Sequence, residues 1–589
     1  MRWGLGSGID ARMKSEEQNG MTALVWLTAA LRARFAAVLG AVPAQVGVVE
    51  ATNPQFGDYQ CNAAMGLAKQ LGKPPRALAE AVVAAGPLPQ GVARMEVAGP
   101  GFINITLEDT WILAQADGLA RDPRGGIPQV GTGKTVIVDY SSPNVAKPMH
   151  IGHIRSTIIG NAIDRMYRSL GYRVLADNHI GDWGTQFGIL IMGYRTFLDQ
   201  DRLQAAPIEE LERIYVASYE RARSDDAWME ACRAELVKLQ QGDPGNRALW
   251  QQFIQLSLAA FERVYERLDV RFDLVRGESY YHDDLAGVVA RLTEQGLATE
   301  SDGALVVFLE EEGLPVCIVR KRDGGFNYAT TDLATVLARE AEFAPDRIIY
   351  VTDERQQLHF KQFFTIAAKL GCQSQLEHVW FGLMRLPDAT FSTRQGNVIK
   401  LEALLDEAER RAFTLVSTAS PDMPEAERRA VARAVGIGAV KYADLSQNPQ
   451  TLITFTWDKA LALDGNSGPY LQYAYARIAS LLDKYAVREG HSVAADTPLQ
   501  ITDPRERTLL LQVVRFPDAV VRAAAAYRPS IIADYLYALS QAYSSFYQNV
   551  PCLRAEPGIC ESRVRLCAIT ADVLRRGLGL LGIETPSRI

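Results

Sequence analysis

The segment SSPNVAKPMHIGH at residues 141–153 gathers residue types that can do chemistry: His150 and His153 around an Ile-Gly pair, with Lys147 just before them. Such residues serve in zinc sites, in acid–base catalysis and in phosphate-binding loops. A zinc site needs further ligands, and His179 alone among the other histidines lies near in the sequence. Acid–base catalysis is less favoured, because no Ser or Cys nucleophile is placed beside the histidines. Histidines that merely cap a helix remain a further alternative.

The elements predicted around this segment favour phosphate binding. TVIVDY before it is a β-branched run typical of a buried parallel strand, and IRSTIIGNAIDRMYRSLGY after it repeats apolar residues at helical spacing. YRVLADN predicts the next strand and completes a βαβ unit, whose ligands bind at the carboxyl ends of the strands. The histidines therefore lie at a helix N-terminus, which favours an anion. Lys147 adds positive charge there, and Gly152 lets a flat base approach the backbone.

The rest of the chain predicts a sheet in two halves, separated by an insertion. After a long, charged, mostly helical stretch at about 190–315, the pattern resumes with the helix NYATTDLATVLARE, the strand RIIYVTD, the helix LHFKQFFTIAAKLG and the strand EHVWFGLMRL. A small α/β region precedes the sheet and ends in the alternating strand VAGPGFINITL. Helices without strands are predicted after about residue 400. The fold class is therefore α/β: a split Rossmann-type parallel sheet with an insertion, a small N-terminal α/β domain and an all-α C-terminal domain.

Composition excludes several classes of protein. A chain of 589 residues exceeds one hydrophobic core, and no stretch reaches the ~18 uninterrupted apolar residues of a membrane span. Residues 1–20 lack the apolar run of a signal peptide, so we expect a flexible extension and a cytoplasmic protein. The seven cysteines are scattered, which argues against a disulfide framework or a zinc module. The net charge of −7 gives no hint of nucleic acid, although the arginine-rich, lysine-free stretch after residue 505 permits such a partner.

HIGH at 150–153 resembles the first signature of class I aminoacyl-tRNA synthetases, and VDYSSPNVAKPMHIGHIRSTIIG resembles the arginyl-tRNA synthetase form of it. An ordered series of similar segments covers nearly the whole chain: FGDYQCNAAM, GDWGTQFG, NYATTDLA, VTDERQQLHF, FSTRQGNVI, GNSGPYLQYAYARI and FPDAVVRAAAAYRPSIIADYLYALSQAYSSFY. The family's Asp-Ala-Leu-Arg signature is not literal here, because RRGLGLLGI occupies that region. The resemblance implies these domains: a tRNA-contacting domain at 21–125, a catalytic domain at 126–400, a helical connecting region at 401–460 and an anticodon-binding domain at 461–589.

The resemblance also implies a reaction. L-arginine and ATP, the latter with Mg²⁺, give arginyl-adenylate, and the arginyl group then moves to the terminal adenosine of tRNA(Arg). The chemistry needs positioned substrates and stabilised phosphate charge, with no covalent enzyme intermediate and no tightly bound metal. Bound tRNA is implied to be necessary even for the first step, and we expect a monomer. Two alternatives stay open: a non-catalytic tRNA-binding relative and a nucleotidyltransferase that makes a small-molecule adenylate.

Substrate-binding residues follow from the matching positions. The resemblance assigns ATP to His150, Gly152, His153, Lys147, Ser392, Thr393 and Arg394, and arginine to Asp139, Asn144, Tyr328, Asp332 and Gln356. Both lysines of the usual Lys-Met-Ser-Lys-Ser signature are missing from TFSTR at 390–394, so Lys147 is expected to replace them. A guanidinium prefers a bidentate carboxylate, and the spacing of Tyr328 and Asp332 places both on one helix face. Without the resemblance, Asp332 would equally suggest a helix cap.

Candidates for tRNA contact come from both ends of the chain. They are Asn53, Phe56, Gln60, Tyr527 and Tyr547, while Gly57 and Asp58 are expected to make a turn. Tyrosines can stack on splayed bases, although most tyrosines of the last domain are expected in its core.

Overall fold

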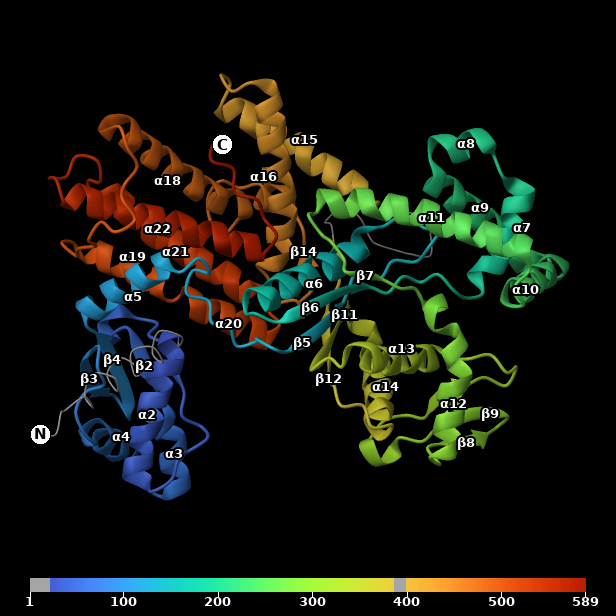
Figure 1. The fold of residues 1–589 in the computed structure, drawn as a ribbon, viewed down its shortest axis with the longest axis horizontal. Coiled ribbons are helices and arrows are strands. Elements are labelled where there is room, and N and C mark those ends of the chain that lie inside the picture. The colour runs from blue at the N-terminus through green and yellow to red at the C-terminus, as the bar shows by residue number, and fades with distance from the viewer. Residues whose placement is uncertain (1–21, 386–398) are drawn as a thin grey trace, which may run out of the picture.

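The computed structural model describes residues 22–385 and 399–589 (Figure 1). The predicted extension at 1–20 and the second-signature residues Ser392, Thr393 and Arg394 lie outside the described residues. Within them, the chain forms an N-terminal α/β region, a central parallel sheet with an insertion, and a helical region that ends the chain.

In the N-terminal region, helices pack on an antiparallel sheet of order β1-β2-β4-β3 (Figure 1). Its elements are α2 (Ala23–Leu39), β1 (Val48–Glu50), η1 (Pro54–Phe56), β2 (Tyr59–Cys61), α3 (Ala63–Leu71), α4 (Pro75–Ala84), β3 (Val92–Ala98), β4 (Phe102–Leu107) and α5 (Asp109–Arg121). Thr22 caps α2 by accepting the N–H of Val25, and Gly40 ends the helix in the left-handed conformation. Ile103 and Ile105 of β4 are buried in the core, so the alternating strand predicted here is present.

Five parallel strands form the central sheet in the order β12-β11-β5-β6-β7. They are β5 (Thr135–Asp139), β6 (Arg173–Asn178), β7 (Leu274–Val275), β11 (Arg347–Asp353) and β12 (Gln375–Phe381), with α6 (Ile151–Ser169), α13 (Tyr328–Phe343) and α14 (Gln357–Lys369) packed around them. Val136 and Val138 of β5 share a core with α6, whereas Ile137 packs in a separate core with α13 and α14. Both faces of the sheet are covered, which explains the continuous apolar run. The predicted parallel sheet is confirmed.

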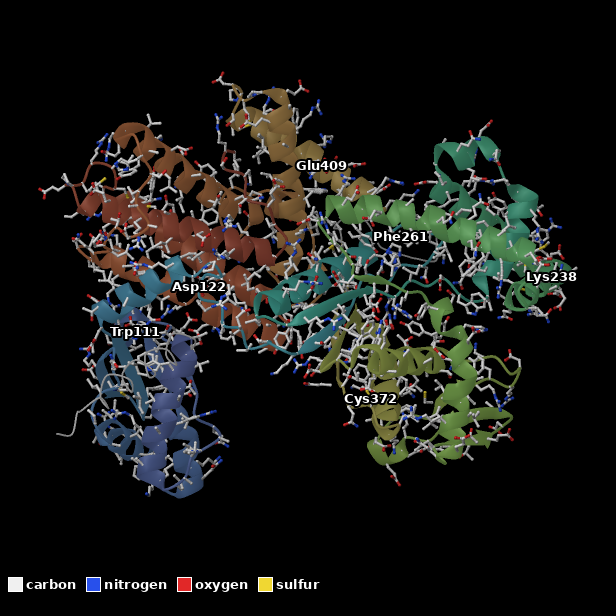
Figure 2. The ribbon with its side chains drawn as sticks, in the orientation of Figure 1. Trp111, Asp122, Lys238, Phe261, Cys372 and Glu409 are labelled. Atoms are coloured by element: carbon white, nitrogen blue, oxygen red, sulfur yellow. The ribbon has the colours of Figure 1, made fainter. Side chains whose placement is uncertain are left out.

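The insertion between β6 and α13 begins with α7 (Gln186–Phe197), α8 (Gln200–Ala205), α9 (Pro207–Ser224), α10 (Asp226–Gln240) and α11 (Pro244–Arg267). Arg267, at the end of α11, pairs with Glu409 at 2.9 Å; Figure 2 labels Glu409 in the helical region and Phe261 on α11. The chain then returns to the sheet, because β7 pairs with β6. A small unit follows: η2 (Glu278–Asp284), α12 (Leu285–Glu294), β8 (Ala298–Ser301), β9 (Ala304–Val307), η3 (Glu310–Glu312) and β10 (Cys317–Arg320). Strands this short show no alternation, so the sequence did not predict them.

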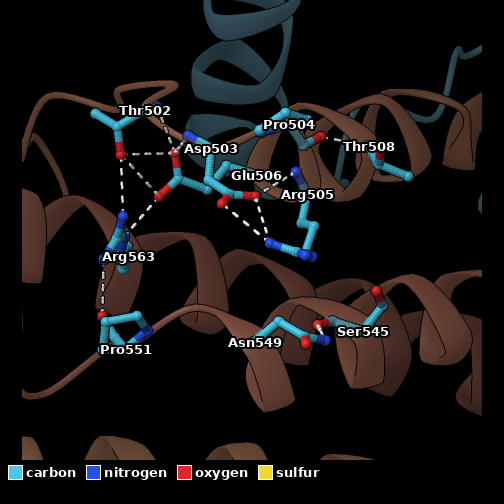
Figure 3. Close-up of polar contacts among 10 residues, drawn as sticks. All are labelled: Thr502, Asp503, Pro504, Arg505, Glu506, Thr508, Ser545, Asn549, Pro551 and Arg563. Carbon is cyan, nitrogen blue, oxygen red and sulfur yellow. Dashed lines mark hydrogen bonds and ion pairs between the residues drawn. The ribbon is translucent and has the colours of Figure 1, made fainter.

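Helices predominate after residue 400: α15 (Leu401–Ala419), α16 (Glu425–Leu445), α17 (Trp457–Ala460), α18 (Gly468–Glu489), α19 (Pro504–Val514), α20 (Phe516–Ala526), α21 (Ser530–Asn549) and α22 (Ile559–Leu580). The expectation of no strands here is corrected by β14 (Ile453–Thr454), which pairs with β13 (Met384–Arg385). Asp503 and Glu506 form a capping box at the start of α19. Arg563 of α22 donates to Glu506 at 2.6 Å and to the carbonyl of Pro551 at 2.8 Å; both contacts are drawn in Figure 3.

Ion pairs hold the N-terminal region against the helical region. Asp58 is buried, and both of its carboxylate oxygens accept hydrogen bonds from Arg507 of α19 at 2.8 Å. Asp58 also accepts the N–H of Leu107 at 2.8 Å. The predicted role of Asp58 as a turn residue is therefore incomplete, because a buried carboxylate requires a cation and hydrogen-bond donors around it.

Candidate active site

The loop that follows β5 is held in an unusual conformation by side chains from two helices. Ser141, Ser142 and Ala146 have φ angles of 72°, 46° and 63°, which residues with a side chain rarely adopt. The N–H of Ser141 donates to the hydroxyl of Ser156 on α6 at 2.9 Å, and the N–H of Ala146 donates to the hydroxyl of Ser257 on α11 at 2.9 Å. The surroundings thus impose the shape of the loop, a feature that is concentrated at functional sites.

His150 and His153 cap the N-terminus of α6 with their own side chains. Nδ1 of His150 accepts the N–H of Gly152 at 3.0 Å, and Nδ1 of His153 accepts the N–H of His150 at 3.0 Å. A neutral imidazole that accepts through Nδ1 carries its proton on Nε2. The two rings, with centroids 3.9 Å apart, therefore each present an Nε2–H donor. The capping role is realised, and it orients donors that suit a phosphate oxygen.

Positive charge at this end of the site comes from Lys147. Burial and repulsion by His150 lower the pKa of His153 to about 3, and burial and repulsion by Lys147 lower the pKa of His150. Both rings are therefore neutral at neutral pH. The ammonium of Lys147 lies 4.9 Å from the centre of the Tyr215 ring on α9. Burial lowers the pKa of Lys147, while Glu212 of the same helix acts in the opposite direction.

Two glycines permit close contacts at the loop. A Cβ atom at Gly152 would lie 2.7 Å from the His150 ring, so any side chain there would displace this imidazole. A Cβ atom at Gly181, in the GDWG segment, would lie 2.2 Å from Oδ1 of Asn144. Asn144 is exposed and forms a parallel bridge with Gly181. Gly181 therefore determines where the Asn144 amide can lie.

Asp139, one of the predicted arginine-binding residues, is already paired inside the protein. Its Oδ2 accepts from Arg339 of α13 at 2.6 Å, and its Oδ1 accepts from the hydroxyl of Ser142 at 3.1 Å. Arg339 is buried and also binds Asp177 of β6 at 2.9 Å. Buried charges of this kind need one another. Asp139 thus balances the charge of Arg339 and supports the loop through Ser142, while its contact with arginine stays a prediction.

Tyr328, Asp332 and Gln356 lie around the facing ends of α13 and α14. Tyr328 and Asp332 are one turn apart at the start of α13, and Tyr328 is 71% exposed. Oδ2 of Asp332 accepts a hydrogen bond from Nε2 of His359 on α14 at 2.5 Å. Gln356 is exposed and closes η4 (Glu354–Gln356), which joins β11 to α14. The hydrogen bond between Asp332 and His359 joins the starts of α13 and α14, next to η4 at the carboxyl end of β11.

Glu278 joins these residues and was not predicted from the sequence. It begins η2, just after β7, and its pKa rises to about 8 because of burial and repulsion by Asp332 and Asp182. Asp182 is already satisfied by the N–H and hydroxyl of Ser279, at 2.8 and 2.6 Å. Asp332 and Glu278 are therefore the carboxyl groups suited to a cationic ligand. No motif marked Glu278, because β7 is too short to be predicted and its carboxyl end could not be located.

The chain beyond the second signature pairs with the loop that carries HIGH. The N–H of Ile151 donates to the carbonyl of Ile399 at 3.1 Å, and the N–H of Leu401 donates to the carbonyl of Met149 at 2.9 Å. Between them, Lys400 pairs with Glu209 of α9 at 3.0 Å. The segment that leaves the second signature is therefore a neighbour of the first signature in the fold.

The N-terminal tRNA candidates lie in one short stretch around η1. Asn53 caps η1 by accepting the N–H of Gln55 at 3.0 Å, and Phe56 is 44% exposed. The amide of Gln60 donates to Oδ1 of Asn104 at 2.8 Å. Phe56 is the candidate with the most open side chain.

Tyr527 and Tyr547 occupy different environments. The hydroxyl of Tyr527 accepts from Arg347 of β11 at 2.6 Å, and its ring lies parallel to that of Tyr167 on α6, with centroids 6.4 Å apart. Tyr527 therefore fastens the helical region to the sheet, which argues against the predicted base-stacking role. Tyr547 is 38% exposed, and the guanidinium of Arg477 lies 5.5 Å from its ring.

Tyr547 lines a cavity of about 750 Å³ in the helical region. Its basic and aromatic lining residues are Tyr473, Arg477, Lys484, Tyr547, Arg554 and Arg588. No acidic side chain lines it within the described part of the chain. Aromatic rings among positive charges are typical of surfaces that bind single-stranded nucleic acid.

Residues 22–385 and 399–589 contain neither a group of side chains suited to a metal ion nor a helix suited to a membrane. No three His, Cys, Asp or Glu side chains in these ranges are grouped so that they could hold a metal ion. Nδ1 of His179 instead lies 3.0 Å from the carbonyl oxygen of Arg276. None of the described helices is long and apolar enough to cross a membrane.

Known protein families match the chain in three consecutive parts. Residues 27–107 match the arginyl tRNA synthetase N terminal domain, residues 117–457 the catalytic domain of tRNA synthetases class I (R), and residues 471–589 the DALR anticodon binding domain. The arginine--tRNA ligase of Fusobacterium nucleatum is 47% identical over 539 residues, which cover 91% of this chain and 94% of that protein. The chain belongs to the arginyl-tRNA synthetase family.

Other relatives agree with this membership in the arginyl-tRNA synthetase family. The arginine--tRNA ligase of Laribacter hongkongensis is 45% identical over 573 residues, covering 95% of this chain and 99% of that protein. The arginyl-tRNA synthetase structure from Thermus thermophilus superposes with a TM-score of 0.82 at 25% identity, and the match covers 96% of this chain and 100% of that chain. The structure from Plasmodium falciparum has the same TM-score of 0.82 at 26% identity, with 96% of this chain and 98% of that chain covered. The chain is an arginine--tRNA ligase with a class I catalytic domain. Neither alternative function is favoured by these likenesses, and the DALR domain is present although its literal signature is not.

Proposed function

We propose that the residues around the carboxyl edge of the sheet activate L-arginine with ATP and then transfer the arginyl group to the terminal adenosine of tRNA(Arg). AMP and pyrophosphate are released. The observation that carries this proposal is the opposite character of the two ends of the site. Nε2–H donors and Lys147 suit a polyphosphate at one end, and the carboxyl groups of Asp332 and Glu278 suit a guanidinium at the other.

At the ATP end, no side chain needs to form a covalent bond. The carboxylate of arginine attacks the α-phosphorus of ATP, and pyrophosphate leaves with the electron pair of the broken P–O bond. His150 and His153 stabilise the developing charge as neutral hydrogen-bond donors, because the low pKa of His153 excludes a role as a general acid. Lys147 supplies the positive charge beside the Mg²⁺ that accompanies ATP, and Gly152 lies under the adenine. Ser392, Thr393 and Arg394 are proposed to assist from the second signature.

At the arginine end, charge and shape select the substrate. Asp332 and Glu278 bracket the guanidinium, Tyr328 covers it, and Gln356 closes the pocket. Asn144 is left to bind the α-amino end, since Asp139 is engaged by Arg339. A site of partly buried carboxyl groups disfavours substrates without a matching cation, because the carboxyl groups would then lack their partner.

The tRNA is proposed to contact both terminal regions. The basic, aromatic cavity around Arg477 and Tyr547 receives anticodon bases, and the stretch with Asn53, Phe56 and Gln60 touches a loop of the tRNA. This assignment corresponds to a tRNA-contacting domain at 21–125, a catalytic domain at 126–400 and an anticodon-binding domain at 461–589. The helical connection at 401–460 joins the last two. We place the enzyme in the cytoplasm and expect it to act as a monomer.

Exchange of labelled pyrophosphate into ATP tests the proposal. Arginine-dependent exchange with tRNA(Arg) present, and none without it, is the expected result. Exchange without tRNA would retain the chemistry and reject its dependence on tRNA. Folded protein with no exchange under either condition would reject the catalytic assignment.

A further inference from the structure

His359 makes the direct protein contact to Asp332. It lies in the first turn of α14, and its Nε2 donates to Oδ2 of Asp332, on α13, at 2.5 Å. The side chains of His359 and Asp332 are 28% and 27% exposed, so water screens this contact only in part. A hydrogen bond to an ionised carboxylate is about twice as strong as one between neutral groups. The contact is therefore strong enough to select one orientation of the Asp332 carboxylate.

The position of the imidazole is itself fixed by aromatic packing. The His359 ring lies 5.7 Å from the ring of Phe360 and 5.4 Å from that of Phe363, centroid to centroid. The ring of His378 stacks on Phe360 at 4.1 Å, and Nε2 of His378 is 2.8 Å from the hydroxyl of Thr352. These aromatic contacts restrict the orientations of the His359 imidazole, so that it can support Asp332.

The surroundings of Asp332 are acidic, and His359 is a neighbouring donor that can orient its carboxylate. Asp332 and Asp182 both raise the pKa of Glu278, so acidic groups crowd the carboxyl group that the substrate must meet. With Oδ2 held by His359, Oδ1 is directed by the same hydrogen bond. A planar guanidinium, whose donors form a rigid fork, requires such fixed acceptors.

We propose that His359 is a positioning residue, which sets the orientation of the Asp332 carboxylate for the guanidinium of arginine. This inference rests on the proposed function, in which Asp332 binds the substrate side chain. His359 touches neither ATP nor the reacting carboxylate in this arrangement. It therefore acts on the arginine requirement and leaves the ATP requirement and the chemical step nearly unchanged.

Steady-state pyrophosphate exchange with three variants of His359 and one control variant tests the proposal. His359→Ala should raise the KM for arginine about tenfold or more, the effect of losing one hydrogen bond to a charged group. His359→Gln places an amide N–H near the position of Nε2 and should stay within about threefold of the wild type. His359→Asn is too short to reach Asp332 and should behave like His359→Ala. His491→Gln removes an exposed imidazole of the helical region, which contacts neither His359 nor Asp332, so it is the matched control and should leave the KM for arginine within about twofold.

The outcomes separate the inference from the function on which it rests. In the Asp332→Ala background, His359→Ala should cause no further rise in the KM for arginine, because its effect passes through Asp332. Equal effects of Gln and Asn at position 359, or a full additional loss in the Asp332→Ala background, would overturn the positioning role. If His359→Ala does not fold, the comparison of Gln with Asn decides. If Asp332→Ala itself leaves the KM for arginine unchanged, the pocket assignment fails instead.

Discussion

The two ends of the active site are built in different ways. The ATP end comes from one short stretch, in which Lys147, His150 and His153 follow a strand and open a helix, and the backbone of that helix orients the imidazoles. The arginine end is assembled from Glu278, Asp332 and His359, which belong to three elements far apart in the sequence. A locally built end keeps its geometry through capping, whereas an assembled end depends on how its elements pack. Substitutions at the two ends should therefore change different kinetic constants.

The largest effect is expected at the assembled end. Asp332→Ala removes a charged partner of the guanidinium and leaves the substrate cation poorly matched, so the KM for arginine should rise at least ~150-fold, equivalent to about 3 kcal/mol. The KM for ATP should change little. Pyrophosphate exchange at varied arginine and ATP concentrations measures both. An equal rise in the two constants would show that the ends are not separate.

Lys147→Ala should impair the locally built ATP end, where the affected quantity is the rate of adenylate formation and not the KM for arginine. Loss of the positive charge that meets the phosphates should slow adenylate formation about 100-fold and spare tRNA binding. Single-turnover formation of the adenylate, together with tRNA binding measured by filter retention, gives both values. Lys147→Arg retains the charge and is the matched control. A more damaging effect of Arg394→Ala would show that the second signature, and not Lys147, provides the main cation.

Gly181→Ala tests whether the position of Asn144 depends on the GDWG segment. The new Cβ would meet Oδ1 of Asn144, and overpacking of this size costs about 1–3 kcal/mol. The KM for arginine should rise roughly twentyfold, because Asn144 is proposed to bind the α-amino end. Gly287→Ala, at a position where a Cβ meets nothing within 4 Å, is the control. No change in Gly181→Ala would remove Asn144 from the site.

The smallest effect is expected far from both ends. Tyr547→Ala should lower kcat/KM for tRNA(Arg) about three- to tenfold through loss of one stacking contact, with no change in the KM for arginine. Aminoacylation at varied tRNA concentrations measures this. Tyr527→Phe removes only the hydroxyl that Arg347 binds. It should lower the Tm of the protein and leave kcat/KM for tRNA(Arg) nearly unchanged. A reversed pattern would exchange the roles of the two tyrosines.

The parallel sheet, its helices and the ATP end were predictable because each depends on contiguous residues. The run TVIVDY and the helical spacing after it identify β5 and α6. The histidines lie at the N-terminus of α6, as the sequence predicts. Glu278 was not predictable, since β7 and the strands beside it are too short to give a pattern. The pairing of Asp139 with Arg339 was missed for a related reason. Only the packed sheet brings β5, β6 and α13 together and shows which carboxylates are already neutralised.

The most direct test of the carboxyl pair is a proton count during arginine binding. Glu278 has a pKa of about 8 in the unliganded protein, so it is mostly protonated at pH 7. A guanidinium favours the ionised form, which lowers this pKa and releases the proton. Affinity for arginine should therefore increase as the pH rises from 6 toward 8, and then level off.

Titration calorimetry of L-arginine into the tRNA-bound enzyme without ATP, at pH 7 in buffers of different ionisation enthalpy, measures the number of protons released. Release of close to one proton per arginine is expected for the wild type, and almost none for Glu278→Gln. Wild-type binding without proton release, or equal release in both proteins, would contradict the assignment of Asp332 and Glu278 as the guanidinium site.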